Sequence, residues 1–309
     1  MEEIRKINGY EFFGQWAGHP IRDLKTIRDF ALRYRRDDPI VYLAGDSSLD
    51  NKFWVPESGP DGESLDVPVP EIYQQLFERG FPKPDVAFWM NHVMGSNATC
   101  INAAIEASML RQRDSKLLPQ DEFIHDSIRK EDVLVVSVGA NDIALKPAIS
   151  TIWHMLRLAW LTRYSSITSG TAWSLPYFAN LFGPKIQDYV GRLCAKTKPR
   201  AVIICMIYYP LEAQYGQLGW ADLPLKLLGY NRDPKQLQAT IRKIFEMGTM
   251  QIQIDGSEVV PCKLYEILDG KQEDDYTARV EPSSAGGRRM AEMFKILVNE
   301  ILARQETRG

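Results

Sequence analysis

The chain has 309 residues, of which 45% are hydrophobic and 25% charged, and its net charge is −3. A slightly acidic chain without a basic block argues against nucleic acid and against anionic membrane surfaces as its main partners. The first residues, Met1 to Lys6, are charged and lack the apolar run of a signal peptide, so we expect a cytoplasmic protein. Length permits one enlarged α/β domain, and we predict a single domain over residues 1–309.

The first strong pattern is a helix followed by a strand. Apolar residues recur at helical spacing between Leu24 and Tyr34, and Pro39 stops the pattern before an apolar strand near residues 40–45. That strand ends in Gly45-Asp46-Ser47. Ligands bind at the carboxyl ends of strands in open α/β sheets, so Ser47 can offer its hydroxyl and its N–H group to a site there. An ordinary turn, with Asp46 accepting N–H groups, is the equally simple alternative.

The next segments alternate between helix and strand. Residues 55–70 are rich in proline and glycine and are predicted to form a surface loop insertion beside the site. Helical patterns follow over residues 71–79 and 85–94. A second strand is predicted over residues 98–105, and it ends in Glu106-Ala107-Ser108.

The clearest strand covers residues 133–138, which are apolar and mostly β-branched, as in a parallel strand covered on both faces. It ends in Gly139-Ala140-Asn141-Asp142, a further polar turn at a carboxyl end. Asn141 suits an unusual turn conformation, but its amide N–H group could also stabilise an oxyanion. The two interpretations remain open at this point.

The second half continues the alternation. Twelve apolar-rich residues over 151–162 reach only about 18 Å as a helix, too short to cross a bilayer, and we expect them in the core. A second loop insertion, able to cover a pocket, is predicted near residues 163–183. The remaining predictions are helices over 186–193, from 233 onward and over 284–303, a strand over 201–208, and short extended pieces at 251–254 and 259–261.

The four cysteines are widely spaced and form no CxxC pair. We interpret them as buried thiols, and we predict neither a metal centre nor a cofactor.

The ordered polar turns, Gly45-Asp46-Ser47 and then Gly139-Ala140-Asn141-Asp142, resemble the SGNH hydrolase superfamily of GDSL-type esterases and lipases. The resemblance covers most of the chain. It implies that Ser47 is the nucleophile and that the oxyanion hole comprises the Ser47 N–H group, Asn141 and, by position, Ala107. It also implies a three-layer α/β/α sandwich with a five-stranded parallel sheet, flavodoxin-like in form, and a small-molecule ester or other acylated substrate.

The chain departs from the family just before its last helix. Where the family has Asp-x-x-His-Pro, this sequence has Ala278 and Glu281 in place of Asp and His, and every histidine lies upstream. Glu281 is therefore the predicted base. A carboxylate of pKa about 4.3 is a weaker base than an imidazole of pKa about 6.5 unless burial raises its pKa. Asp275 is predicted to raise the pKa of Glu281 further, and Arg279 to lower it.

These residues predict hydrolysis of an acyl ester through Ser47 and Glu281. A structural alternative is that Glu281 caps the last helix or pairs with a cation. In that case the chain would be a binding or scaffolding protein that keeps the pocket without turnover. Acyl transfer to an alcohol would use the same residues as hydrolysis.

Overall fold

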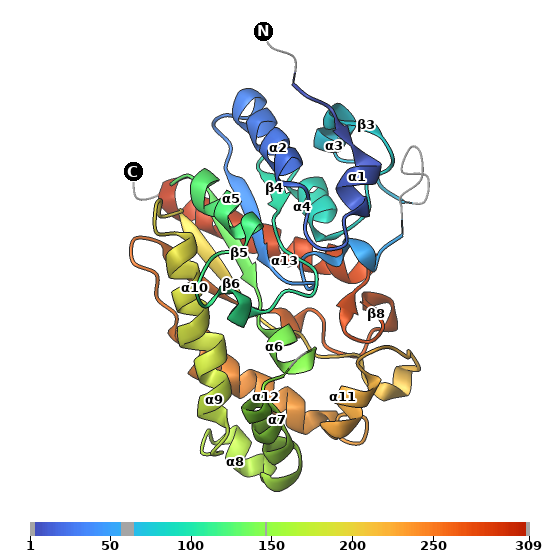
Figure 1. The fold of residues 1–309 in the computed structure, drawn as a ribbon, viewed down its shortest axis with the longest axis vertical. Helices are drawn as coiled ribbons and strands as arrows, with labels where there is room; N and C mark the ends of the chain where they lie inside the picture. The colour runs from blue at the N-terminus through green and yellow to red at the C-terminus, as the bar shows by residue number, and fades with distance from the viewer. Residues whose placement is uncertain (1–3, 57–64, 146, 307–309) are drawn as a thin grey trace.

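The computed structural model describes residues 4–56, 65–145 and 147–306 (Figure 1). The strands are β1 (Ile7–Asn8), β2 (Ile40–Gly45), β3 (Phe77–Arg79), β4 (Thr99–Asn102), β5 (Val133–Ser137), β6 (Ala201–Met206), β7 (Glu258–Lys263), β8 (Tyr276–Thr277) and β9 (Glu281–Pro282). The α-helices are α1 (Gly9–Gly14), α2 (Ile21–Tyr34), α3 (Glu71–Leu76), α4 (Val86–Met94), α5 (Pro119–Ser127), α6 (Ala140–Ala144), α7 (Ile149–Leu156), α8 (Tyr164–Thr168), α9 (Leu175–Asn180), α10 (Ile186–Leu193), α11 (Asp222–Leu227), α12 (Pro234–Met247) and α13 (Ser284–Glu306). Two π-helical stretches, η3 (Arg157–Leu161) and η4 (Leu181–Lys185), continue α7 and α9.

The main sheet has five parallel strands in the order β4-β2-β5-β6-β7. Its three central strands, β2, β5 and β6, are buried along their whole length, which fits their continuous apolar sequences. Because all five strands run the same way, their carboxyl ends share one edge. The turns that follow β2, β4 and β5 therefore meet there, as predicted.

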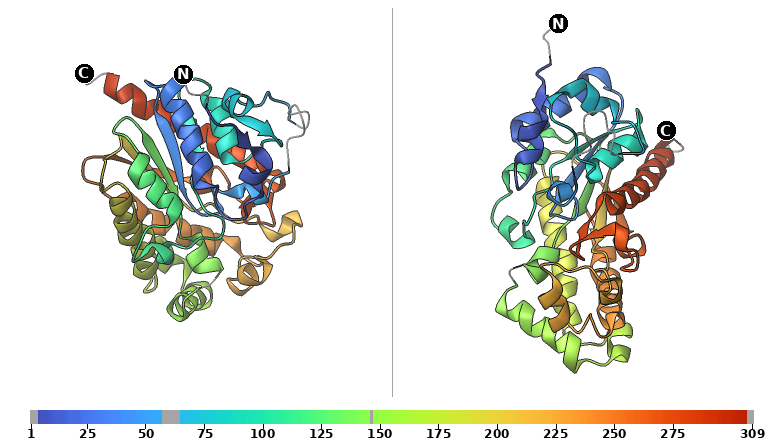
Figure 2. Two further views of the ribbon diagram at one scale, coloured as in Figure 1. Left: turned by 45° about the horizontal axis from the view of Figure 1, so that its top comes forward. Right: turned by 90° about the vertical axis from the view of Figure 1, so that its right-hand side faces the viewer.

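Helices cover both faces of the sheet, and the views in Figures 1 and 2 agree on the layers. Helices α2, α5 and α10 pack together on one face, whereas α4 and α13 pack against each other on the opposite face. The predicted three-layer α/β/α sandwich is confirmed. All four cysteines are buried and free, as expected.

A group of helices, α6 to α9 with α11 and α12, lies beyond the carboxyl edge of the sheet (Figure 1). Two predictions about it are wrong. Residues 163–183 form helices α8 and α9 and the start of η4 rather than a loop, and the segment 151–162 is mostly exposed or half-buried rather than core. Of the predicted insertion at 55–70, residues 57–64 lie outside the described residues.

Other boundaries also differ from the prediction, among them those of the segment after α3 and of the last helix. Residues 77–79 leave the helix of α3 to form β3, because they pair with β1 near the start of the chain. The last helix continues to Glu306. Within the described ranges, no helix is both long and apolar enough to cross a membrane.

Candidate active site

The turn after β2 is fixed by the neighbouring strand β5. Gly45 has a φ of +143°, and a Cβ atom there would lie 1.7 Å from the carbonyl oxygen of Ser137, so no other residue fits. The Asp46 N–H group donates to that same oxygen at 3.0 Å. Asp46 Oδ1 in turn accepts from the N–H and hydroxyl groups of Ser48, as the turn interpretation of Asp46 predicted. The turn leaves Ser47 beside the edge of the sheet, with 7% of its surface exposed.

The turn after β4 wraps around the same glycine. The Ile105 N–H group and the Ser108 hydroxyl both donate to the carbonyl oxygen of Gly45, each at 3.0 Å. Between them, Ala107 has a φ of +57°, the left-handed conformation that normally favours glycine. Asn141, at the start of α6, donates its amide to the carbonyl oxygen of Ser108 at 3.0 Å. The structure thus brings the turns that carry Ser47, Ala107 and Asn141 together.

The three turns at this edge carry hydrogen-bond donors that are still available. Among the described residues, the backbone N–H groups of Ser47 and Ala107 make no hydrogen bond. The Asn141 amide has a second N–H besides the one that Ser108 accepts. Ser47 and Asn141 line the cavity described below, whereas Ala107 does not.

Glu281 lies on β9, which pairs with β8 through Thr277. Its side chain is buried and lines the cavity with Ser47. The Trp220 indole donates to Oε1 at 3.3 Å, while Oε2 has no partner of ordinary geometry among the described residues. Burial raises the pKa of Glu281 to about 7, a rise that the Ser47 hydroxyl and the Trp220 indole oppose. A buried carboxylate with this pKa approaches an imidazole in basicity.

Two more buried acids adjoin Glu281. Burial raises the pKa of Asp46 to about 6, and it raises the pKa of Glu106 to about 8 with a further contribution from the charge of Glu281. Glu106 accepts from the Trp54 indole at 3.4 Å, and its Oε2 is unpartnered among the described residues. Burial thus moves the pKa of both Glu281 and Glu106 toward neutral pH, and a charge on Glu281 opposes ionisation of Glu106.

Asp275 is placed differently from the prediction. It pairs with Arg289 of α13, and the pKa of Glu281 is raised by burial and by Asp46 rather than by Asp275. Arg279 is also turned away, since it forms an ion pair with Asp222 at 2.8 Å. The structural alternative for Glu281 is not seen either: the Ser283 hydroxyl accepts from the Gly286 N–H group and so caps α13, and among the described residues Glu281 forms no ion pair.

Ser47, Asn141 and Glu281 line a cavity of about 160 Å³. Its polar lining includes Asp46, Ser47, Asn141 and Glu281. The rest is mostly apolar and comes from the helices beyond the sheet, including Ala144, Met155, Leu158, Phe178, Phe182, Leu225, Leu237 and Ile241. An apolar cavity of about 150 Å³ holds benzene, so this one fits an aryl or short acyl group.

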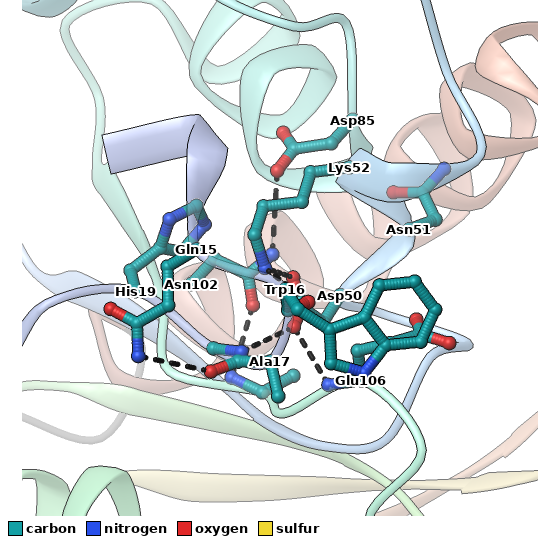
Figure 3. A network of polar contacts seen from close by, with 12 residues as sticks. Gln15, Trp16, Ala17, His19, Asp50, Asn51, Lys52, Asp85, Asn102 and Glu106 are labelled. Atoms are coloured by element: carbon teal, nitrogen blue, oxygen red, sulfur yellow. Dashed lines mark hydrogen bonds and ion pairs between the residues drawn. The ribbon is translucent and has the colours of Figure 1, made fainter. Parts of the chain in front are cut away.

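A buried ion pair between Asp50 and Lys52 lies in the segment that follows Ser47 (Figure 3). Asp50 Oδ1 accepts from Lys52 Nζ at 2.6 Å, and both side chains are at most 1% exposed. Asp50 Oδ2 accepts from the N–H groups of Gly18 and Glu106 at 2.8 and 2.7 Å. One carboxylate therefore ties the N-terminal segment, the Ser47 loop and the turn after β4 together.

Sequence reasoning missed three groups at this site, namely Trp220, Glu106 as a titrating acid, and Tyr208, whose hydroxyl donates to the Val280 carbonyl oxygen at 2.6 Å. Only Glu106 could have been noticed, since it adjoins Ala107 in a recognised turn. No histidine is among the cavity-lining residues that the structure describes. Nor do the described residues contain a group of three or more His, Cys, Asp or Glu side chains arranged for a metal ion.

The protein is therefore an α/β/α sandwich with a buried serine and a buried carboxylate, Ser47 and Glu281, at the carboxyl edge of its sheet. No family model and no curated protein matches the sequence. Similar solved structures include an extracellular lipase from Streptomyces rimosus, with 10% identity over 82% of this chain and 95% of that one and a TM-score of 0.42. An aryl esterase from M. smegmatis has 11% identity over 85% of this chain and 99% of that one, with a TM-score of 0.41. A family 3 carbohydrate esterase from Clostridium thermocellum has 13% identity over 86% of this chain and 98% of that one, with a TM-score of 0.40. Likenesses of such low identity concern the fold alone.

Proposed function

We propose that this chain is an SGNH-like serine esterase in which Glu281 replaces the usual histidine. The observation that carries the proposal is the buried Glu281 carboxylate, with its pKa raised to about 7, beside the Ser47 hydroxyl at an apolar cavity. Buried groups whose pKa is shifted toward neutrality by desolvation are typical of catalytic acids and bases.

In the proposed reaction, the ionised Glu281 carboxylate takes the proton of Ser47 as its oxygen attacks the ester carbonyl carbon. The N–H groups of Ser47 and Ala107 and the amide of Asn141 stabilise the resulting oxyanion. Protonated Glu281 then gives its proton to the departing alkoxide, leaving an acyl-serine. A water molecule, deprotonated by Glu281, then attacks the acyl-serine carbonyl carbon. As the bond to the Ser47 oxygen breaks, the acid is released and Glu281 returns the proton to Ser47. Trp220 is a positioning residue that holds one oxygen of Glu281.

The test is covalent labelling by a fluorophosphonate probe, which reacts with activated serines. We expect the wild type to be labelled and Ser47→Ala to remain unlabelled. The control is Ser48→Ala: Ser48 is equally buried beside Ser47, but its hydroxyl is engaged with Asp46 and Ser137. No labelling of the folded wild type, or equal labelling of Ser47→Ala, would favour the binding protein without turnover.

A further inference from the structure

The helices around the cavity expose an unusual number of large apolar side chains. We call the following residues the rim surface: Ile152, Trp153, Leu156, Trp160, Leu161, Trp173, Leu223 and Leu227. Leu161, Leu223 and Trp173 are the most exposed of them, at 81%, 65% and 62%. Scattered apolar residues are normal on a protein surface, but a concentration of them on neighbouring helices indicates a binding surface.

The rim surface belongs to the same helices that line the cavity. In α7 and η3, Met155 and Leu158 face the cavity while Leu156 and Leu161 are exposed. Helix α11 repeats this division, with Leu225 at the cavity and Leu223 exposed. Each helix is therefore apolar on two sides, although a single apolar stripe is enough to attach a helix to a core.

The two parts of the rim surface are joined. The Trp160 indole of η3 donates to the carbonyl oxygen of Leu227 in α11 at 2.7 Å. Trp153 and Trp173 form an edge-to-face pair with ring centroids 5.5 Å apart. The exposed side chains of α7, η3 and α11 thus form a connected surface beside the cavity.

The charge around the rim surface is positive, in contrast to the chain as a whole. Residues 147–184 contain no Asp or Glu, and their cations are Arg157 and Arg163. The Arg157 guanidinium lies 5.2 and 4.5 Å from the ring centroids of Trp153 and Trp173, and Arg163 is exposed. In α11, Lys226 is exposed, and Asp222 is paired with Arg279. The rim surface is therefore cationic and rich in aromatic residues, although the net charge of the whole chain is −3.

We propose that the rim surface docks onto an anionic lipid membrane. Tryptophan and leucine with flanking Arg and Lys are the residues that place a helix in the membrane interface. A second copy of the chain is a poorer occupant, because a twofold interface would bring two cationic surfaces together. If the proposed esterase function holds, docking would place the cavity at the lipid surface, and the substrate would be an ester carried there, with its acyl or aryl part entering the cavity.

The test measures cosedimentation and tryptophan fluorescence with vesicles of phosphatidylcholine, with or without phosphatidylglycerol. We expect the wild type and Ser47→Ala to bind equally, and more tightly to the anionic vesicles. Binding by Ser47→Ala separates docking from catalysis, so loss of the esterase proposal would leave this result unaffected. The double variant Leu161→Asp/Leu223→Asp removes apolar area and adds negative charge, and should weaken vesicle affinity by about tenfold or more.

The matched control is Ile296→Asp, an exposed apolar residue of α13 away from the rim surface, which should bind like the wild type. Because the altered side chains are exposed, the variants should keep the thermal unfolding of the wild type. The proposal is overturned if the wild type does not bind anionic vesicles, or if the double variant binds them as the wild type does. A wild-type dimer that the double variant dissociates, without vesicle binding, would assign the rim surface to a second copy.

Discussion

Asp50 and Glu281 are both buried carboxylates near the Ser47 loop, but their surroundings differ. Asp50 accepts hydrogen bonds from Gly18, Glu106 and Lys52, and the lysine supplies a full countercharge. Glu281 has one indole donor at 3.3 Å and a second oxygen without a partner of ordinary geometry among the described residues. The Asp50 carboxylate is fully paired, whereas the Glu281 carboxylate is removed from water and has few hydrogen bonds in exchange.

Because of this difference, Asp50 is suited to hold the structure together and Glu281 is suited to exchange a proton. A paired charge is costly to disturb, so Asp50 can fix three segments relative to one another. An underpaired carboxylate binds its proton more tightly, and the pKa of Glu281 accordingly moves to about 7. Asp50 lies outside the cavity lining and Glu281 lines the cavity, an arrangement suited to a preorganised site.

We expect the largest effect from Lys52→Met, which removes the cation that pairs with Asp50. It leaves the Asp50 charge buried without its cation, and the free energy of unfolding should fall by about 3–5 kcal/mol. The control is Lys196→Met, which removes an exposed ion pair to Asp126 and should leave the free energy of unfolding nearly unchanged. Urea unfolding measures both. Similar small losses for the two variants would show that Asp50 needs no countercharge.

Asn141→Ala tests the oxyanion hole. Loss of one such donor costs about 2.7–4 kcal/mol of transition-state stabilisation, a fall in kcat of roughly 10²–10³-fold. The variant also loses the hydrogen bond to Ser108, worth about 1 kcal/mol of folding stability. Asn91→Ala is the control, because the Asn91 amide bonds backbone groups outside the cavity and should affect stability alone. If kcat per folded molecule is unchanged in Asn141→Ala, Asn141 is only a turn residue.

Glu281→Gln tests the contrast between the two carboxylates through the pH dependence of the free energy of unfolding. The folded-state pKa of Glu281 is raised, so the stability that its protonated form contributes is lost as pH rises from about 4.5 through about 7. The neutral amide avoids this loss. Thermal or urea unfolding should therefore find the variant nearly equal to the wild type at low pH and more stable by about 2–3 kcal/mol at pH near 8. A variant that is less stable than the wild type at both pH values would contradict this.

The smallest effect is expected from Glu106→Gln. Because burial and Glu281 raise the pKa of Glu106 to about 8, its carboxyl group is mostly neutral at pH near 7, where an amide resembles it. Esterase rates there should stay within about threefold of the wild type. Any change in the wild-type rate between about pH 8 and 9 should disappear in the variant. A fall of about a hundredfold at neutral pH would instead make Glu106 a proton donor in the reaction.

Much of the fold could be predicted because β2, β5 and β6 have continuous apolar sequences that end in polar turns. Parallel strands bring such turns to one edge, so the meeting of Ser47 and Asn141 followed from the order of the segments. The strand β3 could not be predicted, because it depends on pairing with β1 some 70 residues earlier in the chain. Local periodicity carries no information about so distant a partner.

The errors at the site have a similar cause. The sequence places Asp275 six residues before Glu281, but the contact with Arg289 of α13 decides where its carboxylate points. Apolar richness predicted a buried helix over 151–162, yet composition does not reveal whether a second apolar side is covered. Trp220 reaches Glu281 across 61 residues, and nothing in the local sequence marks it.

The most direct test of Glu281 as the base of Ser47 is the initial rate of hydrolysis of a short-chain aryl ester between about pH 4 and 9. It compares the wild type with Ser47→Ala and Glu281→Gln. We predict that the wild-type rate rises with pH through an inflection near 7, as Glu281 ionises, and that neither variant shows serine-dependent hydrolysis. Equal rates for the wild type and Ser47→Ala across this range would contradict the esterase function, and an unchanged inflection in Glu281→Gln would assign the base to another group.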